Sequence, residues 1–176
     1  MEQNMKLRLL LIVLFTALNL YAITIGEKPK ELLLSGKDGG LVKGGAWDSS
    51  MLRDKVYVMF YVDPDKKDVN EAFSQALKKK DYRSKGAFGS IAIVNMAATW
   101  KPNFAINMIL KGKQKEFPKT IYVKDNNKIL VKEWKLGDDA SNIVIFNKKG
   151  EVIFYKSGKM EKNDTQKAFQ LIEENI

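Results

Sequence analysis

The chain has 176 residues, with 30 basic and 21 acidic side chains and a formal net charge of +9 at pH 7. It contains neither cysteine nor histidine, which excludes thiolate catalysis, dithiol exchange, thiolate metal sites and the commonest general base near neutral pH. Any catalysis would have to use carboxylate, lysine, tyrosine, serine or threonine side chains, and we predict no cofactor, no metal site and no catalytic residue.

The first 22 residues have the order of a secretory signal peptide. Lys6 and Arg8 precede an apolar run over residues 9–18, and after a polar break the small residue Ala22 follows. The apolar run is much shorter than the roughly 20 residues that a helix needs to cross the hydrocarbon core. We therefore expect cleavage after Ala22, a periplasmic location and no stable membrane span afterwards. Retention of the segment as an anchor is the alternative.

Residues 23–176 have the length of one domain and contain no internal repeat or low-complexity tract. Their lysines are scattered, with short clusters at residues 78–80 and 111–115. Scattered lysine is typical of a solubilising surface rather than of a nucleic-acid-binding stripe. The second cluster could contact an anionic partner, but a lysine-rich helix end is the simpler interpretation. We expect no nucleic-acid partner.

Strands and helices alternate in the first part of this domain. Glycine-rich turns surround a short strand at residues 41–43. A nearly continuous run of aromatic and branched residues at 56–62 is typical of a central strand covered on both faces. An amphipathic helix follows at 68–80, then a second apolar strand at 90–96 and a helix that begins near Pro102. This alternation predicts parallel strands with right-handed crossovers.

The C-terminal part is predicted to contain short strands and one helix. We expect the strands at residues 120–123, 129–131, 142–146 and 151–155, the last two forming a hairpin. Asn163 or Asp164 can cap the final helix. The fold class that follows is α/β, a sandwich with a mixed central sheet, flanking helices and a C-terminal hairpin plus helix.

Trp47, Trp100 and Trp134 could stack on a ligand. Several aromatic residues of the chain fall on predicted strands, however, where large rings usually pack into the core or lie half-buried on the sheet. We therefore expect core positions for most of them.

Over nearly its full length, residues 23–176 resemble the YtfJ family of periplasmic thioredoxin-like proteins. The resemblance rests on the order and spacing of four stretches rather than on a catalytic signature. These stretches are residues 67–77, 93–95, 134–136 and 141–158. It implies a thioredoxin-like fold.

Redox members of that fold carry a Cys-x-x-Cys pair in the turn after the central strand and a cis-proline before the hairpin strand. The corresponding stretches here are residues 63–67, with sequence Asp-Pro-Asp-Lys-Lys, and residues 139–142, with sequence Asp-Ala-Ser-Asn. Both halves of the thiol site are missing. The resemblance therefore implies the scaffold without its redox activity, since the site rather than the fold decides function.

The same two stretches, together with Asp68 just after the first, supply the candidate ligand-binding residues, which apart from Asp68 we expect to share one surface depression. They are Asp63, Pro64, Asp65, Asp68, Ser141 and Asn142. The Ser141 hydroxyl and the Asn142 amide could bind the extended backbone of an envelope protein, or a small ligand. The structural alternative is that the aspartates only shape the turn and cap the following helix.

An enzyme of another class remains as an alternative. An apolar strand that ends in Asp63-Pro64-Asp65, with Asp138 and Asp139 downstream, resembles the acidic motifs of haloacid-dehalogenase-like phosphatases. In that hypothesis Asp63 is the nucleophile and Asp65 the acid/base, and magnesium is required. Polar residues before Gly137 and Lys67 two positions after Asp65 argue against it.

Overall fold

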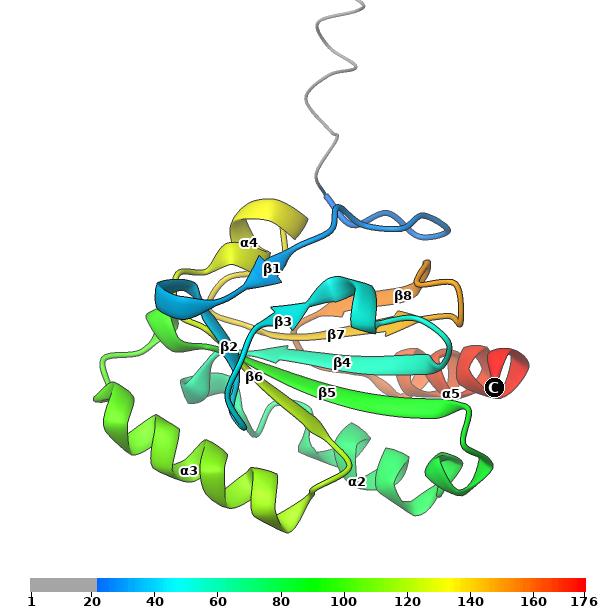
Figure 1. Cartoon of the computed structure of the whole chain (residues 1–176). Helices are drawn as coiled ribbons and strands as arrows, with labels where there is room; N and C mark the ends of the chain where they lie inside the picture. Colours follow the sequence, from blue (N-terminus) through cyan, green and yellow to red (C-terminus); the bar gives the residue numbers. More distant parts are fainter. Residues whose placement is uncertain (1–21) are drawn as a thin grey trace, which may run out of the picture.

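A computed structural model describes residues 22–176, and the predicted signal peptide lies outside these residues except for Ala22. The described residues form one six-stranded sheet with helices on both faces and a small two-stranded sheet beside it (Figure 1). The expected α/β sandwich with a mixed sheet is thus confirmed. Within this range, no helix combines the length and apolar character needed to cross a membrane.

The large sheet has the order β2-β6-β5-β4-β7-β8. The parallel pairs are β4 with β5 and β5 with β6, whereas β7 is antiparallel to both β4 and β8. The predicted central strand, the parallel pairing and the hairpin are therefore confirmed. The strands of the two sheets are β1 (Leu33–Leu34), β2 (Gly39–Leu41), β3 (Trp47–Asp48), β4 (Val56–Val62), β5 (Phe88–Asn95), β6 (Ile121–Asp125), β7 (Ser141–Phe146) and β8 (Val152–Ser157).

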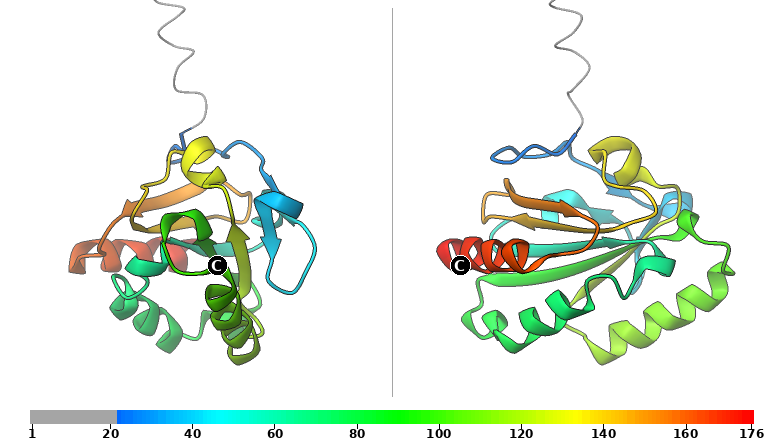
Figure 2. Two further views of the ribbon diagram at one scale, coloured as in Figure 1. Left: turned by 90° about the vertical axis from the view of Figure 1, so that its left-hand side faces the viewer. Right: turned by 180° about the vertical axis from the view of Figure 1, so that it is seen from behind.

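Each face of the sheet has its own core, as the alternation of buried side chains along β4 requires. Met59 and Tyr61 pack on one side with Trp47 and Trp134, whose rings meet edge to face at 6.5 Å. The other side is covered by helices (Figure 2), two of which contribute the stacked rings of Phe73 and Phe169. The four helices are α2 (Glu71–Lys79), α3 (Asn103–Glu116), α4 (Ile129–Trp134) and α5 (Lys162–Asn175).

The prediction of a strand at residues 129–131 was wrong, because this segment begins helix α4. The buried carboxylate of Asp125, at the end of β6, accepts the backbone N–H groups of Asn127, Ile129 and Leu130. Such bonds satisfy amides that a helix start leaves without partners. Leu130 and Trp134, four residues apart, then lie on one buried face.

Smaller corrections concern the element ends. The early strand is β2 at residues 39–41 rather than 41–43, and α2 begins at Glu71, not at residue 68. The N-cap of α5 is Glu161, which forms a capping box with Asp164 at the third helical position. Trp47 and Trp134 are core residues, as expected for most of the aromatic residues, and Trp100 is an exception because it is exposed.

The pairing of β2 with β6 needs a glycine at position 39. Gly39 has a φ of +123°, and a Cβ there would lie 1.9 Å from the carbonyl oxygen of Lys124. Gly44 has a similarly positive φ of +104° but open space around its Cβ position. Alanine substitutions at these two glycines therefore distinguish the cost of backbone strain from the cost of steric overlap.

We predict that Gly39→Ala lowers the free energy of unfolding by about 3 kcal/mol or more, through strain and overlap together. Gly44→Ala is the matched control and should cost only about 1 kcal/mol, from strain alone. Urea denaturation of both variants measures the difference. Equal losses would contradict the steric argument.

Candidate functional site

Three buried polar side chains lie where parallel strands end. Asp63 directly follows β4, Asn95 is the last residue of β5, and Asp125 is the last residue of β6. All three are fully buried. Carboxyl ends of parallel strands meet at one edge of a sheet, which is where α/β proteins usually bind ligands. We call this the carboxyl edge.

Asp63 joins β4 to the loop before β7. Its Oδ2 atom accepts the backbone N–H of Ala140 at 2.8 Å, and its own backbone N–H donates to the Ala140 carbonyl at 3.1 Å. Both polar backbone groups of Ala140 are therefore used inside the protein. The structure thus brings together the two stretches in which the sequence placed the candidate site.

The Asp63 carboxylate is not fully satisfied. Among the described residues, neither its Oδ1 atom nor Oδ1 of Asn95 has a hydrogen-bond partner, and both atoms are buried. Burial raises the pKa of Asp63, although the Asn95 side chain and the Ala140 N–H act in the opposite direction. Asp63 therefore carries an electrostatic cost when it is ionised.

Asn142, a candidate ligand-binding residue, makes only internal hydrogen bonds among those that the structure describes. Its amide nitrogen donates to the carbonyl oxygens of Gly137 and Tyr61, at 2.9 and 3.3 Å. Its oxygen accepts the Gly137 N–H at 3.0 Å and the Tyr155 hydroxyl at 3.3 Å. The side chain is fully buried, so it holds the loop before β7 in place.

Ser141 is also buried and accepts a hydrogen bond from the amide of Asn70 at 3.0 Å. The same amide donates to the Gly158 carbonyl at 2.9 Å, while the Asn70 oxygen accepts the Met160 N–H at 2.8 Å. Asn70, at the start of α2, therefore links this helix to both ends of the C-terminal hairpin. Ser141 and Asn142 support the carboxyl edge from within.

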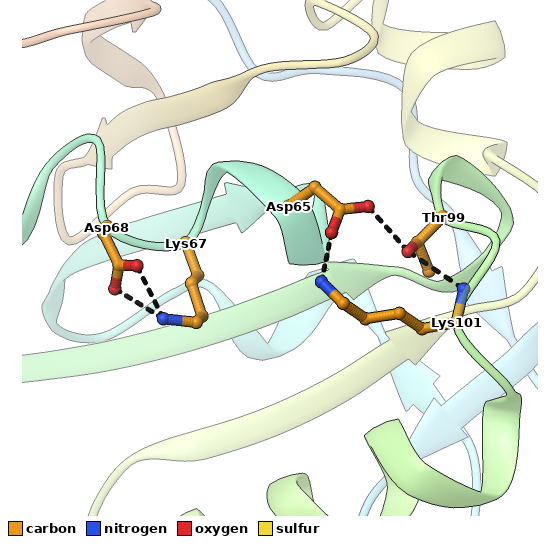
Figure 3. A network of polar contacts seen from close by, with 5 residues as sticks. All are labelled: Asp65, Lys67, Asp68, Thr99 and Lys101. Carbon is orange, nitrogen blue, oxygen red and sulfur yellow. Dashed lines mark hydrogen bonds and ion pairs between the residues drawn. The ribbon is translucent and has the colours of Figure 1, made fainter.

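The remaining candidates, Pro64, Asp65 and Asp68, reach the surface. The Asp65 carboxylate forms an ion pair with Lys101 and accepts the Thr99 hydroxyl at 2.7 Å (Figure 3). Lys101 and then Thr99 lower the pKa of Asp65. Asp68 turns away from this group and pairs with Lys67 at 2.6 Å.

Further ion pairs extend this exposed rim. Lys128 contacts Asp138 at 2.8 Å, and Lys66 contacts Asp139 at 3.7 Å. The Lys128 ammonium group is the main cause that lowers the pKa of Asp138. The sequence analysis did not select Thr99, Lys101 or Lys128. Each follows β5 or β6 closely, so the rule that parallel strands end at one edge could have identified them.

The phosphatase hypothesis finds no site in this geometry. Asp63 is committed to Ala140, Asp65 to Lys101 and Thr99, and Asp139 lies near Lys66. Across residues 22–176, no three acidic side chains are grouped closely enough to hold a metal ion. In that hypothesis Asp63 would have to attack the substrate as nucleophile while Asp65 acts on it as acid/base. Asp63 is buried, which does not suit a nucleophile.

A mixed sheet with this strand order, and no thiol at its carboxyl edge, defines a thioredoxin-like protein without redox cysteines. Solved structures agree with the fold. A protein from Chlorobium tepidum, described as a candidate thiol:disulfide interchange protein DsbE, is 14% identical with a TM-score of 0.63, over 88% of this chain and 99% of that one. The exposed lipoprotein thioredoxin Etrx1 of Streptococcus pneumoniae is 14% identical with a TM-score of 0.56, over 82% and 99%.

The chain belongs to the family described as bacterial protein of unknown function (YtfJ_HI0045), which matches residues 20–175. An uncharacterized protein of Haemophilus influenzae is 29% identical over 146 residues, which are 81% of this chain and 77% of that protein. The resemblance inferred from the sequence is therefore confirmed. The redox descriptions of the structural neighbours apply to those proteins, since identities this low show the fold alone.

The raised pKa of Asp63 yields a prediction on stability. A raised carboxyl pKa in the folded state contributes stability below the unfolded-state pKa, and this contribution is lost as the pH rises through the folded-state pKa. We therefore expect Asp63→Asn, which keeps an oxygen for the Ala140 N–H and removes the buried charge, to stabilise the protein by about 1 kcal/mol at pH 7.

This advantage over the wild type should shrink as the pH falls and the wild-type carboxyl group becomes protonated. Urea denaturation at several pH values measures it. Asp68→Asn, at a largely exposed side chain, is the matched control and should change stability by less than about 0.5 kcal/mol. A destabilised Asp63→Asn variant at pH 7 would show that the charge itself is needed by the fold.

Proposed function

We propose that this protein is an exported binding or accessory module that works without thiol chemistry, with an envelope protein or a small ligand as its partner. The observation that carries the proposal is the chemistry of the turn after the central strand. There Asp65 presents a surface carboxylate that Lys101 and Thr99 hold in place. In this proposal Pro64, Asp65 and Asp68 form the contact surface, and Asp63, Ser141 and Asn142 make it rigid.

The arrangement favours binding over catalysis. Asp65 is ion-paired and its pKa is lowered, which makes its carboxylate a weak base. Asp63 has the raised pKa that functional carboxylates often show, but it is buried and bonded to the backbone of Ala140. A fixed, charged turn is well suited to recognising a complementary polar surface, because little conformational entropy is lost on contact.

Photo-crosslinking in intact cells tests the proposed contact surface. With the photoreactive residue benzoylphenylalanine at position 68, we expect a discrete covalent adduct with one envelope component. The second change Asp65→Lys should reduce its yield at least fivefold, because it removes the carboxylate that the partner would meet. The same photoreactive residue at position 149, in the exposed turn between β7 and β8, is the positional control. Equal adducts at both positions would count against the site.

Export is supported by the order of charged, apolar and small residues up to Ala22. We predict that the intact mass of the protein recovered from the cell envelope corresponds to a chain that begins at Ile23. A full-length mass in the membrane pellet would favour the anchored alternative.

A further inference from the structure

Helix α3 exposes a group of large apolar side chains. Trp100, just before the helix, is 86% exposed, and Phe104, Met108 and Ile109 are 70%, 69% and 62% exposed. Phe104 and Met108 are four residues apart and therefore lie on one side of the helix. We call Trp100, Phe104 and Met108 the α3 outer face, whereas Ile109 lies about 100° or more around the helix from Phe104 and Met108. The other large apolar side chains that are exposed in residues 22–176 are spread over separate segments.

The fold does not account for this face. Ile106 and Leu110 already attach α3 to the sheet, where they form a small core with Met96 and the partly buried Val94 and Tyr122. These inner residues lie about half a turn from Phe104 and Met108. A helix that is apolar on both sides is normally covered on both sides, and Figures 1 and 2 show α3 at the outside of the molecule.

The apolar group continues directly into basic residues. Lys111 and Lys115 extend the line of Phe104 and Met108 at helical spacing, and both are exposed. Neither forms an ion pair within the described part of the chain. The single acidic residue of α3, Glu116, is already paired with Lys113 at 2.9 Å.

A second basic element lies beside this end of the helix. The ammonium groups of Lys78 and Lys113 lie 4.9 and 5.2 Å from the centre of the Phe117 ring. Lys78 belongs to α2, so two helices contribute positive charge to the same area. This positive charge lies near the C-terminal end of α3.

We propose that the α3 outer face docks onto an anionic phospholipid bilayer, with Trp100, Phe104 and Met108 entering the interface and Lys111 and Lys115 contacting the head groups. Tryptophan and phenylalanine beside lysine are the residue types that bind this interface. Each lysine near an anionic surface strengthens binding roughly fivefold. A second copy of the chain is disfavoured as the occupant, because it carries the same net charge of +9 and the same lysines. This surface shares no residue with the partner site proposed above.

Trp100 provides a direct measurement. Trp47 and Trp134 are fully buried, whereas Trp100 is exposed, so a blue shift of tryptophan emission on adding vesicles would report on Trp100 alone. The experiment uses residues 23–176, the mature chain expected after cleavage at Ala22. We expect the shift, and co-flotation, with vesicles of phosphatidylethanolamine and phosphatidylglycerol, and at least tenfold weaker binding to vesicles of phosphatidylcholine alone.

Substitutions at exposed positions separate the two contributions. Phe104→Ser with Met108→Ser should weaken binding to the anionic vesicles at least tenfold, by removing the apolar contact. Lys111→Gln with Lys115→Gln should weaken it about tenfold or more. Lys148→Gln with Lys149→Gln, in the exposed turn between β7 and β8, is the charge-matched control and should change it less than about threefold. Circular dichroism melting confirms that each variant is folded.

Three results would overturn the proposal. One is the absence of vesicle binding by the folded wild-type protein. Another is binding that the control pair weakens as much as the α3 pair, which would indicate attraction by net charge only. The third is a dimer in sedimentation equilibrium that Phe104→Ser with Met108→Ser dissociates, which would make a second copy the occupant. Each result is independent of the crosslinking experiment at position 68.

Discussion

The side-chain amide of Asn142 pairs with both backbone polar groups of Gly137, and the loop before β7 depends on this pairing. Asp63 adds a second attachment through Ala140. A buried peptide group without a hydrogen-bond partner costs about 1–3 kcal/mol. Each of these hydrogen bonds therefore takes the place of one to water, which does not reach the buried groups of the loop. Asp125 does the same for the start of α4. The carboxyl edge is consequently built from side chains that bond to backbone, and its loops have little freedom to rearrange.

This construction explains how a thioredoxin-like scaffold persists without thiols. The fold depends on two apolar cores and on the polar attachments beneath the edge, none of which uses cysteine. In this fold, the residues at a few surface positions decide which chemistry the protein can perform. Here those positions hold Asp65 and its partners Lys101 and Thr99. Similarity to redox proteins with TM-scores of 0.63 and 0.56 therefore describes the scaffold alone.

Two outward surfaces of the molecule differ in chemistry although they adjoin at Thr99 and Lys101. On one side of this connection, nearly every charged side chain in the rim around Asp65 forms an ion pair with a side chain of opposite charge. On the other side, α3 presents apolar side chains and then Lys111 and Lys115, which form no ion pair within the described residues. Paired charges give directional recognition, whereas exposed apolar area with unpaired positive charge suits a broad anionic surface. A single short segment after β5 therefore separates two surfaces of different chemistry.

The sequence by itself determined the excluded chemistry, the central strand, the parallel crossovers and the C-terminal hairpin, because residue types and local apolar runs carry that information directly. It also indicated Asp63, Asp65, Ser141 and Asn142 as neighbours through the resemblance. Only the tertiary structure decided which of them reach solvent, that residues 129–134 form a helix, and that Trp100 is exposed while Trp134 is buried. Burial and capping depend on contacts between distant segments: Asp125 sets the start of α4 from the end of β6, and the inner side of α3 is filled by Ile106 and Leu110, which leaves Trp100 outside.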